Sequence, residues 1–328
     1  MFKVPGFVDL QVNGFLGVSF SGEKITEADF IRVSKEVLKR GTAAFVATVI
    51  TSSEEDFKHD LAIIAKAMKA PELQGRMLGI HAEGPFLSRK PGAVGAHNPD
   101  WVRNPSIEFF KKMQEWADGQ IKILTIAAEN EGAPELTKYA VSQGVTVSLG
   151  HHLAAYDDLC RCADAGATLL THLGNGIPNE INRHNNAIWS GMACDGLTAM
   201  IITDGHHLPM PVIKSIIRAK GIDNAVITSD ASPIAGMPPG VYDTLGNRAV
   251  LEENGLLHNP DKKCLVGSSA TIMECANYLA SLGFLSPEEI FKMAFTNPLE
   301  AIKVDPASIK TGVEYAWDEK LKKFRAIP

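Results

Sequence analysis

Histidine and carboxylate side chains recur along this 328-residue sequence at the ends of short apolar runs. Six of its ten histidines stand at such ends, a concentration that packing does not require. Neutral imidazoles and carboxylates that meet at one place could hold a catalytic metal ion with an open position for water or substrate. The residues at these ends are Asp9, Gln11, Asn13, His81, Glu83, His151, His152, His172, Asn175, Asp204, His206, His207 and Asp230.

Each of these residues also has a purely structural interpretation when it is taken alone. A histidine at the end of a strand often only makes hydrogen bonds. His81 is such a candidate, because side-chain alternation puts it on the same face as Glu83 but one full repeat deeper. Asp204 could form a turn with Gly205, and Asp230 could cap a helix. A metal site is favoured only when the residues are taken together.

The runs that end in these residues alternate with amphipathic helical patterns, which indicates a parallel sheet built from βαβ units. Eight such units favour a closed (β/α)8 barrel, the TIM barrel, in which catalytic groups collect at the carboxyl ends of the strands. No glycine-rich nucleotide-binding motif follows a strand. The apolar runs are 6–13, 43–51, 77–83, 121–129, 145–151, 167–173, 197–204 and 224–230. The helical patterns are 26–40, 54–70, 106–117, 134–143, 155–165 and 210–220.

The pattern changes after the eighth run, where residues 241–258 carry two turn signals. These are Gly246-Asn247 and Asn254-Gly255, and they predict a hairpin inserted before a helix at 270–282. Residues 1–300 are therefore expected to form the barrel with its inserted hairpin. Residues 301–328 are expected to form a C-terminal tail.

Composition and charge exclude several classes of function. A net charge of -6 argues against a nucleic-acid binder with a broad basic face. No apolar run approaches the ~18 residues that span a bilayer, and no signal-peptide pattern opens the chain. The five cysteines include no C-x-x-C pair and are expected to be reduced thiols. We therefore expect a cytoplasmic protein that handles a small molecule, without nucleic-acid or membrane partners.

Several motifs, taken in order, resemble those of the N-acetylglucosamine-6-phosphate deacetylase family in the amidohydrolase superfamily. The resemblance covers about residues 5–300. It implies a TIM barrel of the metal-dependent amidohydrolase type with a small β domain, here reduced or shortened, because only 301–328 follow the barrel. The motifs are PGFVDLQVNG at 5–14, HAEGPF at 81–86, GAHNP at 95–99, GH at 150–151, THL at 171–173 with Asn175, DGHH at 204–207, SDA at 229–231 and LVGS at 265–268.

The resemblance implies that Glu83, His151 and His172 bind one divalent metal ion. His152 remains an alternative to His151, because strand alternation lets only one of the two point inward. Zinc is expected, while iron, cobalt and manganese stay open because they suit the same ligands. Many amidohydrolases have two histidines on the first strand. This chain has Gln11 and Asn13 there, which implies one main metal ion with Gln11 beside it or its water.

The resemblance also implies a mechanism of amide hydrolysis. The metal would lower the pKa of a bound water, and Asp230 would take its proton as general base and pass it to the leaving amine. His97 would contact the substrate near the acetamide and stabilise the oxyanion. The implied substrate-binding residues are His97, Asn175, Gly176, Arg183, His207, Val266 and Gly267.

Arg183 stands eleven residues after His172, as the phosphate-binding arginine of the family does. A guanidinium group suits phosphate because its planar fork can donate two hydrogen bonds at once. The neighbouring residues 182–186 depart from the usual glycine-rich pattern, so a solvated loop arginine is the alternative. The resemblance implies a homodimer in which the loop around Arg183 reaches into the partner's site.

These observations lead us to expect hydrolysis of N-acetylglucosamine 6-phosphate to glucosamine 6-phosphate and acetate. The enzymatic alternatives are the galactosamine epimer or an unphosphorylated sugar. A barrel that binds a ligand without catalysis is the alternative from another class. The joint presence of Glu83, His151, His172 and Asp230 counts against it.

Overall fold

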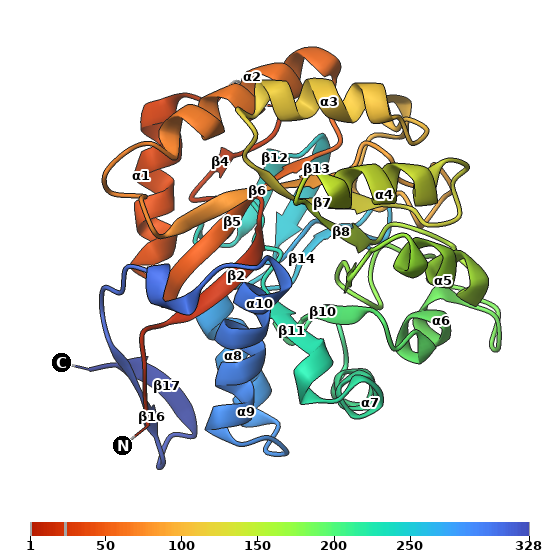
Figure 1. Ribbon diagram of the computed structural model, residues 1–328. Helices are drawn as coiled ribbons and strands as arrows, with labels where there is room; N and C mark the ends of the chain where they lie inside the picture. The colour runs from red at the N-terminus through yellow and green to blue at the C-terminus, as the bar shows by residue number, and fades with distance from the viewer. Residues whose placement is uncertain (1, 23–24, 328) are drawn as a thin grey trace.

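The computed structural model describes residues 2–22 and 25–327, and its centre is an eight-stranded parallel sheet (Figure 1). The strands pair in the order of the chain, so that each lies beside the next. This arrangement confirms the predicted TIM barrel, and each strand lies within or overlaps one of the eight apolar runs. The strands are β2 (Phe7–Val12), β5 (Thr42–Ile50), β6 (Met77–Glu83), β7 (Ile121–Ile126), β8 (Thr146–Leu149), β9 (Leu169–Leu170), β10 (Thr198–Ile202) and β11 (Ala225–Thr228).

Helices follow the strands along the chain and cover the outside of the barrel (Figure 1). The side chains of Thr26, Ser53 and Ser106 each accept a hydrogen bond from the first turn of the helix that follows. All seven expected helices are found, including the one predicted at 270–282, whereas α6, α9 and α10 were not expected. The helices are α1 (Glu27–Leu38), α2 (Glu54–Ala67), α3 (Ile107–Trp116), α4 (Ala133–Ser142), α5 (Tyr156–Asp164), α6 (Ala187–Ala193), α7 (Met210–Lys220), α8 (Ile272–Ser281), α9 (Pro287–Phe291) and α10 (Asn297–Ala301), with a π-helical stretch at Lys292–Thr296.

The barrel is closed where its first and last strands meet. The Asn13 backbone N–H donates to the carbonyl of Ala231 at 2.8 Å. The buried Asp9 carboxylate accepts from the Thr228 hydroxyl at 2.9 Å, from the Ser229 backbone N–H at 3.1 Å and from the Ser229 hydroxyl. Burial raises the pKa of Asp9 above its ordinary value, against these hydrogen bonds. A buried acid thus joins β2 to β11 at the seam of the barrel.

The core has two layers because both faces of a parallel barrel are covered. Alternate side chains of the strands, among them Val8, Leu10 and Val46, pack together as one buried cluster inside the barrel. Phe295 and Leu299, which come after the last barrel helix, belong to the same cluster. The other strand residues pack beneath the surrounding helices. The packed barrel fixes the positions of the side chains at the ends of its strands.

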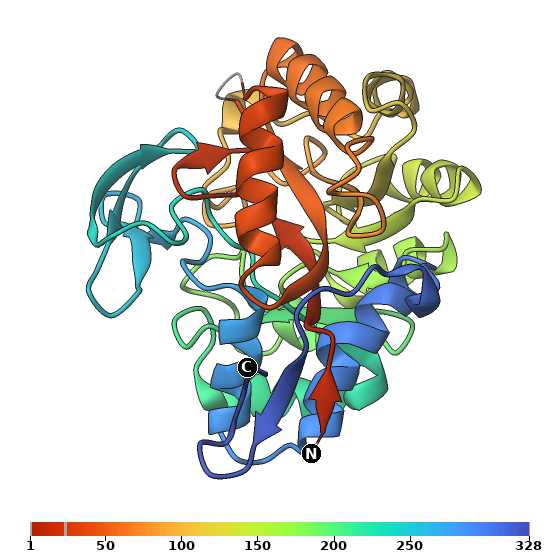
Figure 2. The same ribbon diagram turned by 90° about the vertical axis from the view of Figure 1, so that its left-hand side faces the viewer.

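Two smaller sheets flank the barrel (Figure 2), and β3 (Gly14–Phe15) pairs with β4 (Val18–Ser19) in a third, two-stranded one. The first joins β1 (Lys3–Val4) to β16 (Tyr315–Asp318) and β17 (Lys323–Ala326), so the two chain ends lie side by side. The second contains β12 (Gly240–Thr244), β13 (Asn247–Leu251), β14 (Leu257–Asn259) and β15 (Cys264–Leu265). The expected hairpin at 241–258 is therefore part of a longer four-stranded sheet. The sequence did not predict the last strand, β15, because its two residues are too few to show a pattern. The domain division at residue 300 stays a prediction.

Two expectations from composition concern the membrane and the cysteines. Among the described residues, no helix has both the length and the apolar character needed to cross a bilayer. All five cysteines are free thiols. The cytoplasmic location stays a prediction.

Candidate active site

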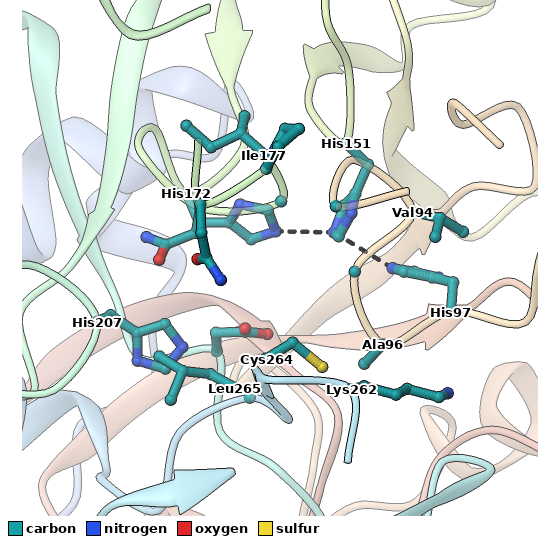
Figure 3. Close-up of a pocket in the computed structure, with 18 of the residues that line it drawn as sticks. Val94, Ala96, His97, His151, His172, Ile177, His207, Lys262, Cys264 and Leu265 are labelled. Atoms are coloured by element: carbon teal, nitrogen blue, oxygen red, sulfur yellow. Dashed lines mark hydrogen bonds between the residues drawn. The ribbon is translucent and has the colours of Figure 1, made fainter. Parts of the chain in front are cut away.

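A cavity of about 910 Å³ opens at the carboxyl ends of the barrel strands (Figure 3). Its lining includes Glu83 from β6, His151 and His172 from the turns after β8 and β9, and Asp230 from the turn after β11. These four of the strand-end residues singled out in the sequence are thus brought to one place from distant parts of the chain.

Four buried groups converge within this cavity. The Nε2 atom of His172 lies 3.0 Å from Glu83 Oε1 and 3.1 Å from His151 Nε2. His151 Nε2 lies 3.3 Å from the same Glu83 oxygen. His97 Nε2 lies 3.2 Å from His151 Nε2, as Figure 3 shows. One carboxylate and three imidazoles therefore face a common point.

The hydrogen bond behind the His151 ring indicates which of its two nitrogens is free. His151 Nδ1 donates to the Ala93 carbonyl at 2.8 Å, so in the neutral ring its Nε2 lone pair faces the cluster. Such a bond behind a metal-binding imidazole fixes its tautomer and its orientation. Burial lowers the pKa of His97 to about 3, which keeps the His97 ring neutral.

Charge in the cluster favours a cation. Burial acts to raise the pKa of Glu83, but its contacts with His151 and His172 hold it well below its ordinary value. Burial acts to lower the pKa of His172, yet the hydrogen bond and charge of Glu83 raise it. Without another cation, His172 is therefore driven to take up a positive charge beside the carboxylate.

The donor set fits one divalent metal ion. Glu83, His97 and His151 offer ligand atoms within 4.8 Å of one another, and His172 lies equally near. Ligands that share a tetrahedral zinc ion at about 2.0–2.2 Å stand about 3.3–3.6 Å apart. The observed separations of 3.0 to 3.3 Å need only a small expansion to reach this spacing.

The backbone at three of these positions adopts the left-handed region, which is rare for residues other than glycine. The φ angles are 50° at His151, 30° at His172 and 52° at Asp230. The chain thus turns sharply at or just after the end of each strand, so simple alternation does not say which side chain faces inward. His151 enters the cluster, whereas His152 accepts a hydrogen bond from Ala154 N–H in its own turn.

Two glycines hold the His151 ring from opposite loops. A Cβ atom on Gly95 would lie 3.0 Å from the ring, and one on Gly176 would lie 2.9 Å from it. Both glycines have positive φ, at 57° and 63°. A side chain at either position would displace the imidazole, so Gly176 has a packing role beside the substrate contact expected of it.

Asp230 is oriented by a neighbour on the first strand. Asn13 Nδ2 donates to Asp230 Oδ1 at 2.7 Å, within the same cavity. Burial and the charge of Glu83 raise the pKa of Asp230 to about 6. The sequence pointed to Asn13 only as a residue that replaces a metal ligand. Its position opposite Asp230 depends on how the barrel closes.

Gln11 and His81 lie beneath the cluster. Gln11 Nε2 donates to Glu83 Oε1 at 2.9 Å, so Gln11 helps to orient the carboxylate. His81 contacts the Leu10 carbonyl at 3.1 Å and Thr125 Oγ1 at 2.7 Å. Burial lowers the pKa of His81 to about 4, and its ring contributes to packing, as its structural interpretation expects.

His207 is anchored on the other side of the cavity. Its Nδ1 donates to Asp204 Oδ2 at 2.8 Å, and Ser268 Oγ donates to the same oxygen at 2.8 Å. Burial acts to raise the pKa of Asp204, but the contacts with His207 outweigh it and lower the pKa. Asp204 therefore fixes the orientation of a ring that lines the cavity.

The remaining residues implied by the resemblance divide into two groups. Asn175, Gly176 and Gly267 line the cavity. Val266 is buried behind the lining, and Arg183 is exposed and does not belong to the lining. The Arg183 carbonyl accepts a hydrogen bond from Trp189 Nε1.

The cavity also contains cations that the sequence reasoning did not select, namely Arg89, Lys262 and Lys263. They lie on loops, where no periodic pattern marks them. A pair of adjacent lysines close to the predicted hairpin was the only available signal.

Comparisons with known proteins give the family. No family model matches the chain. The N-acetylglucosamine-6-phosphate deacetylase of Bacillus subtilis is 32% identical over 264 residues, which are 77% of this chain and 65% of that protein. The same enzyme of Haemophilus influenzae is 30% identical over 303 residues, 92% of this chain and 77% of its own length. An N-acetylgalactosamine-6-phosphate deacetylase of Escherichia coli is 26% identical over 310 residues, 94% of this chain and 80% of its own length.

Solved structures agree with these relatives. The N-acetyl-D-glucosamine-6-phosphate deacetylase of Mycobacterium smegmatis matches with a TM-score of 0.88 and 27% identity, over 99% of this chain and 85% of that one. A mutant of that enzyme in complex with N-acetyl-D-glucosamine-6-phosphate matches with a TM-score of 0.87 and 26% identity, over 97% and 83% of the two chains. The chain spans just under two thirds of the Bacillus relative and about three quarters of the others. It belongs to the N-acetylglucosamine-6-phosphate deacetylase family.

Proposed function

We propose that this protein hydrolyses the acetamide group of N-acetylglucosamine 6-phosphate, which yields glucosamine 6-phosphate and acetate. The observation that carries the proposal is the convergence of Glu83, His151 and His172 in one cavity with Asp230. Relatives that share the fold are deacetylases of this substrate class, and a structural neighbour binds the phosphorylated sugar.

Glu83, His151 and His172 would hold one divalent metal ion, with zinc expected and iron, cobalt or manganese as alternatives. When bound, such an ion polarises an amide carbonyl and lowers the pKa of water. Gln11 would keep the Glu83 carboxylate in place through its hydrogen bond of 2.9 Å.

Asp230 would move the proton. Its carboxylate would accept a proton as water attacks the carbonyl carbon, and would return it to the sugar nitrogen as the C–N bond breaks. A pKa raised to about 6 suits both directions of transfer near neutral pH. Asn13 would orient the carboxylate, and His97 would interact with the acetamide oxygen as charge develops there.

The sugar and its phosphate would contact the rest of the lining. His207, Asn175, Gly176 and Gly267 face the cavity. Val266 is buried, so its contact with substrate would be made by its backbone.

Arg183 could contact the substrate's phosphate only in the cavity of a second subunit. It is exposed and lies outside the cavity of its own chain. In the proposed homodimer it would reach the phosphate in the partner's cavity. Exposed apolar side chains near it, Trp189 at 53% and Ile181 at 40%, support an interface at this face.

Acetate release tests the function directly. The metal-loaded protein is assayed with N-acetylglucosamine, N-acetylgalactosamine and the 6-phosphate of each, and its metal content is measured by elemental analysis. We expect about one divalent ion per chain and the highest kcat/KM for N-acetylglucosamine 6-phosphate. A protein that binds no metal and releases no acetate from any of the four contradicts the proposal and favours a binding role.

The galactosamine epimer is the second candidate, because the E. coli relative that acts on it covers 94% of this chain. A higher kcat/KM for N-acetylgalactosamine 6-phosphate in the same assay identifies that substrate instead.

A further inference from the structure

The cavity has two sides that a substrate amide would use differently. A secondary amide is planar and trans, so the sugar carbon and the acyl chain lie on opposite sides of the C–N bond that breaks. In the proposed function the sugar contacts His207, and the acetamide oxygen lies beside His97. The acyl chain would therefore point away from His207. In Figure 3 the side of the cavity opposite His207 carries Ala96, Cys264 and Lys262 together with His97.

This acyl side of the cavity carries positive charge that no acid neutralises. Lys262 and Arg89 both line the cavity and are exposed. In the part of the chain that the structure describes, neither has a carboxylate at ion-pairing distance. The acidic residues of the lining, Glu83 and Asp230, belong to the catalytic cluster. The methyl group of an acetyl substrate would leave these cations without a partner.

Lys262 is held in place by a neutral partner. Its ammonium group donates to Asn247 Oδ1 at 2.7 Å. The amide nitrogen of the buried Asn247 donates to the carbonyls of Ala96 at 2.9 Å and Leu245 at 2.8 Å. Because both amide hydrogens are used, the amide oxygen must face Lys262. The lysine is thus anchored to the residue that precedes His97, and it keeps its charge and further N–H groups to donate.

The thiol of Cys264 shows that the charge of Lys262 acts inside the cavity. Cys264 is half-buried and belongs to the lining. Burial raises the pKa of this thiol, whereas the charge of Lys262 acts to lower it. The ammonium group therefore lies close enough to influence a group that faces the cavity.

A second cation and free volume extend the same side. Arg89 lies in the loop that carries His97, and the backbone N–H of Ser88 before it donates to the His151 carbonyl at 3.0 Å. The cavity measures about 910 Å³. This volume is near the upper end of the range of about 300–1,000 Å³ for sites that enclose a whole ligand. The cavity therefore has room for an acyl chain longer than acetyl.

We propose that this protein also hydrolyses N-acyl groups that end in a carboxylate, such as N-succinyl, and that Lys262, with Arg89 as a second cation, binds that carboxylate. This inference rests on the proposed deacetylase function and widens its acyl specificity. Unneutralised cations in a cavity raise the local concentration of an anionic ligand and donate charge-assisted hydrogen bonds to it.

The reaction is the same amide hydrolysis with a different acyl group. Water adds to the acyl carbon, and the C–N bond breaks with its electron pair kept by the sugar nitrogen. That nitrogen takes the proton that Asp230 carries. The products are glucosamine 6-phosphate and a dicarboxylate, which is succinate for the N-succinyl substrate.

The test uses glucosamine 6-phosphate that carries an N-acetyl, an N-succinyl or an N-succinamoyl group. The succinamoyl group has the shape of succinyl but ends in a neutral amide. We would measure kcat/KM of the metal-loaded protein from release of the free amine. The value for N-succinyl is expected to exceed that for N-succinamoyl about tenfold, as a hydrogen bond to a charged group would provide.

Variants assign this preference to the lysine. Lys262→Met should lower kcat/KM for N-succinyl about tenfold and change the values for N-acetyl and N-succinamoyl less than about twofold. Lys262→Arg should keep most of the preference because it keeps the charge. Lys58→Met, an exposed lysine on α2 outside the cavity, should change none of the three values.

Three outcomes overturn the inference while the proposed function stands. They are hydrolysis of N-acetyl without hydrolysis of N-succinyl, equal values for N-succinyl and N-succinamoyl, and an equal loss for all three substrates in Lys262→Met. Hydrolysis of N-succinyl without hydrolysis of N-acetyl contradicts the proposed function and supports the inference. A metal-loaded protein that hydrolyses none of the three contradicts both.

Discussion

At the scale of single residues, the close contact of two imidazole nitrogens at 3.1 Å needs a proton or a metal ion between them. His151 directs its free lone pair at this point because its other nitrogen donates to Ala93. His152, one residue later, is equally buried but takes part in no such contact. The two histidines form a natural pair of test and control.

His151→Ala is expected to lose at least about 100-fold in metal affinity, because removal of a ligand costs no less than removal of an outer-shell partner. His152→Ala should retain the metal. Elemental analysis after dialysis against a weak chelator measures both. The reverse result, with metal lost only from His152→Ala, would show that the other histidine is the ligand.

Asp230→Asn is expected to keep its metal and lose about 10²–10⁴-fold in kcat, because an amide cannot accept the proton. Asn13→Ala, which removes only the hydrogen bond of 2.7 Å to that carboxylate, should lose about tenfold. Steady-state acetate release measures both variants. An Asp230→Asn protein with nearly full activity would mean that another group acts as the base.

At the scale of elements, the hydrophobic periodicity of the sequence predicted the regular strands and helices. Buried parallel strands appear in the sequence as apolar runs, and amphipathic helices appear as a 3.6-residue period. The barrel and seven of its helices could therefore be derived. The ends of those strands pointed to Glu83, His172 and Asp230, which line one cavity because parallel strands carry their carboxyl ends to one side of the barrel.

The residues whose positions could not be predicted lie in turns, loops and very short elements, where the sequence has no hydrophobic periodicity. The left-handed turn at His151 breaks strand alternation, which is why His152 stayed open. The short α6 and the two-residue β15 offer too few residues to show a pattern. The approach of Lys262 to the cavity depends on a buried amide, Asn247, that satisfies partners from three segments.

The seam between β2 and β11 provides a prediction at this scale. Asp9→Ala is expected to destabilise the protein by about 3 kcal/mol, because it leaves the buried Ser229 N–H and the hydroxyl groups around it without their acceptor. Chemical denaturation measures this loss. Glu72→Ala, in an exposed turn, should change stability by less than about 0.5 kcal/mol. Equal stability of the two variants would mean that the seam does not depend on Asp9.

At the scale of the whole molecule, the C-terminal strands are joined to the barrel by aromatic packing. The buried Phe324 of β17 meets Phe7 of β2 with ring centres 5.1 Å apart. Phe324→Ala should lower the free energy of unfolding by about 3–5 kcal/mol and shift one single transition in calorimetry. Leu321→Ala, in the same tail but 59% exposed, should have little effect. A separate early transition, with the main one unmoved, would show that the tail unfolds independently.

The left-handed turns at His151, His172 and Asp230 lower the stability of the fold at the residues that line the cavity. A side chain in that backbone region costs on the order of 1–3 kcal/mol, and glycine would relieve it at each position. Exchange for glycine at any of these turns would therefore relax the fold while removing a proposed ligand or the proposed base. The three side chains that line one cavity thus stand where the backbone is strained, so the cavity's polar groups are held at a cost in stability.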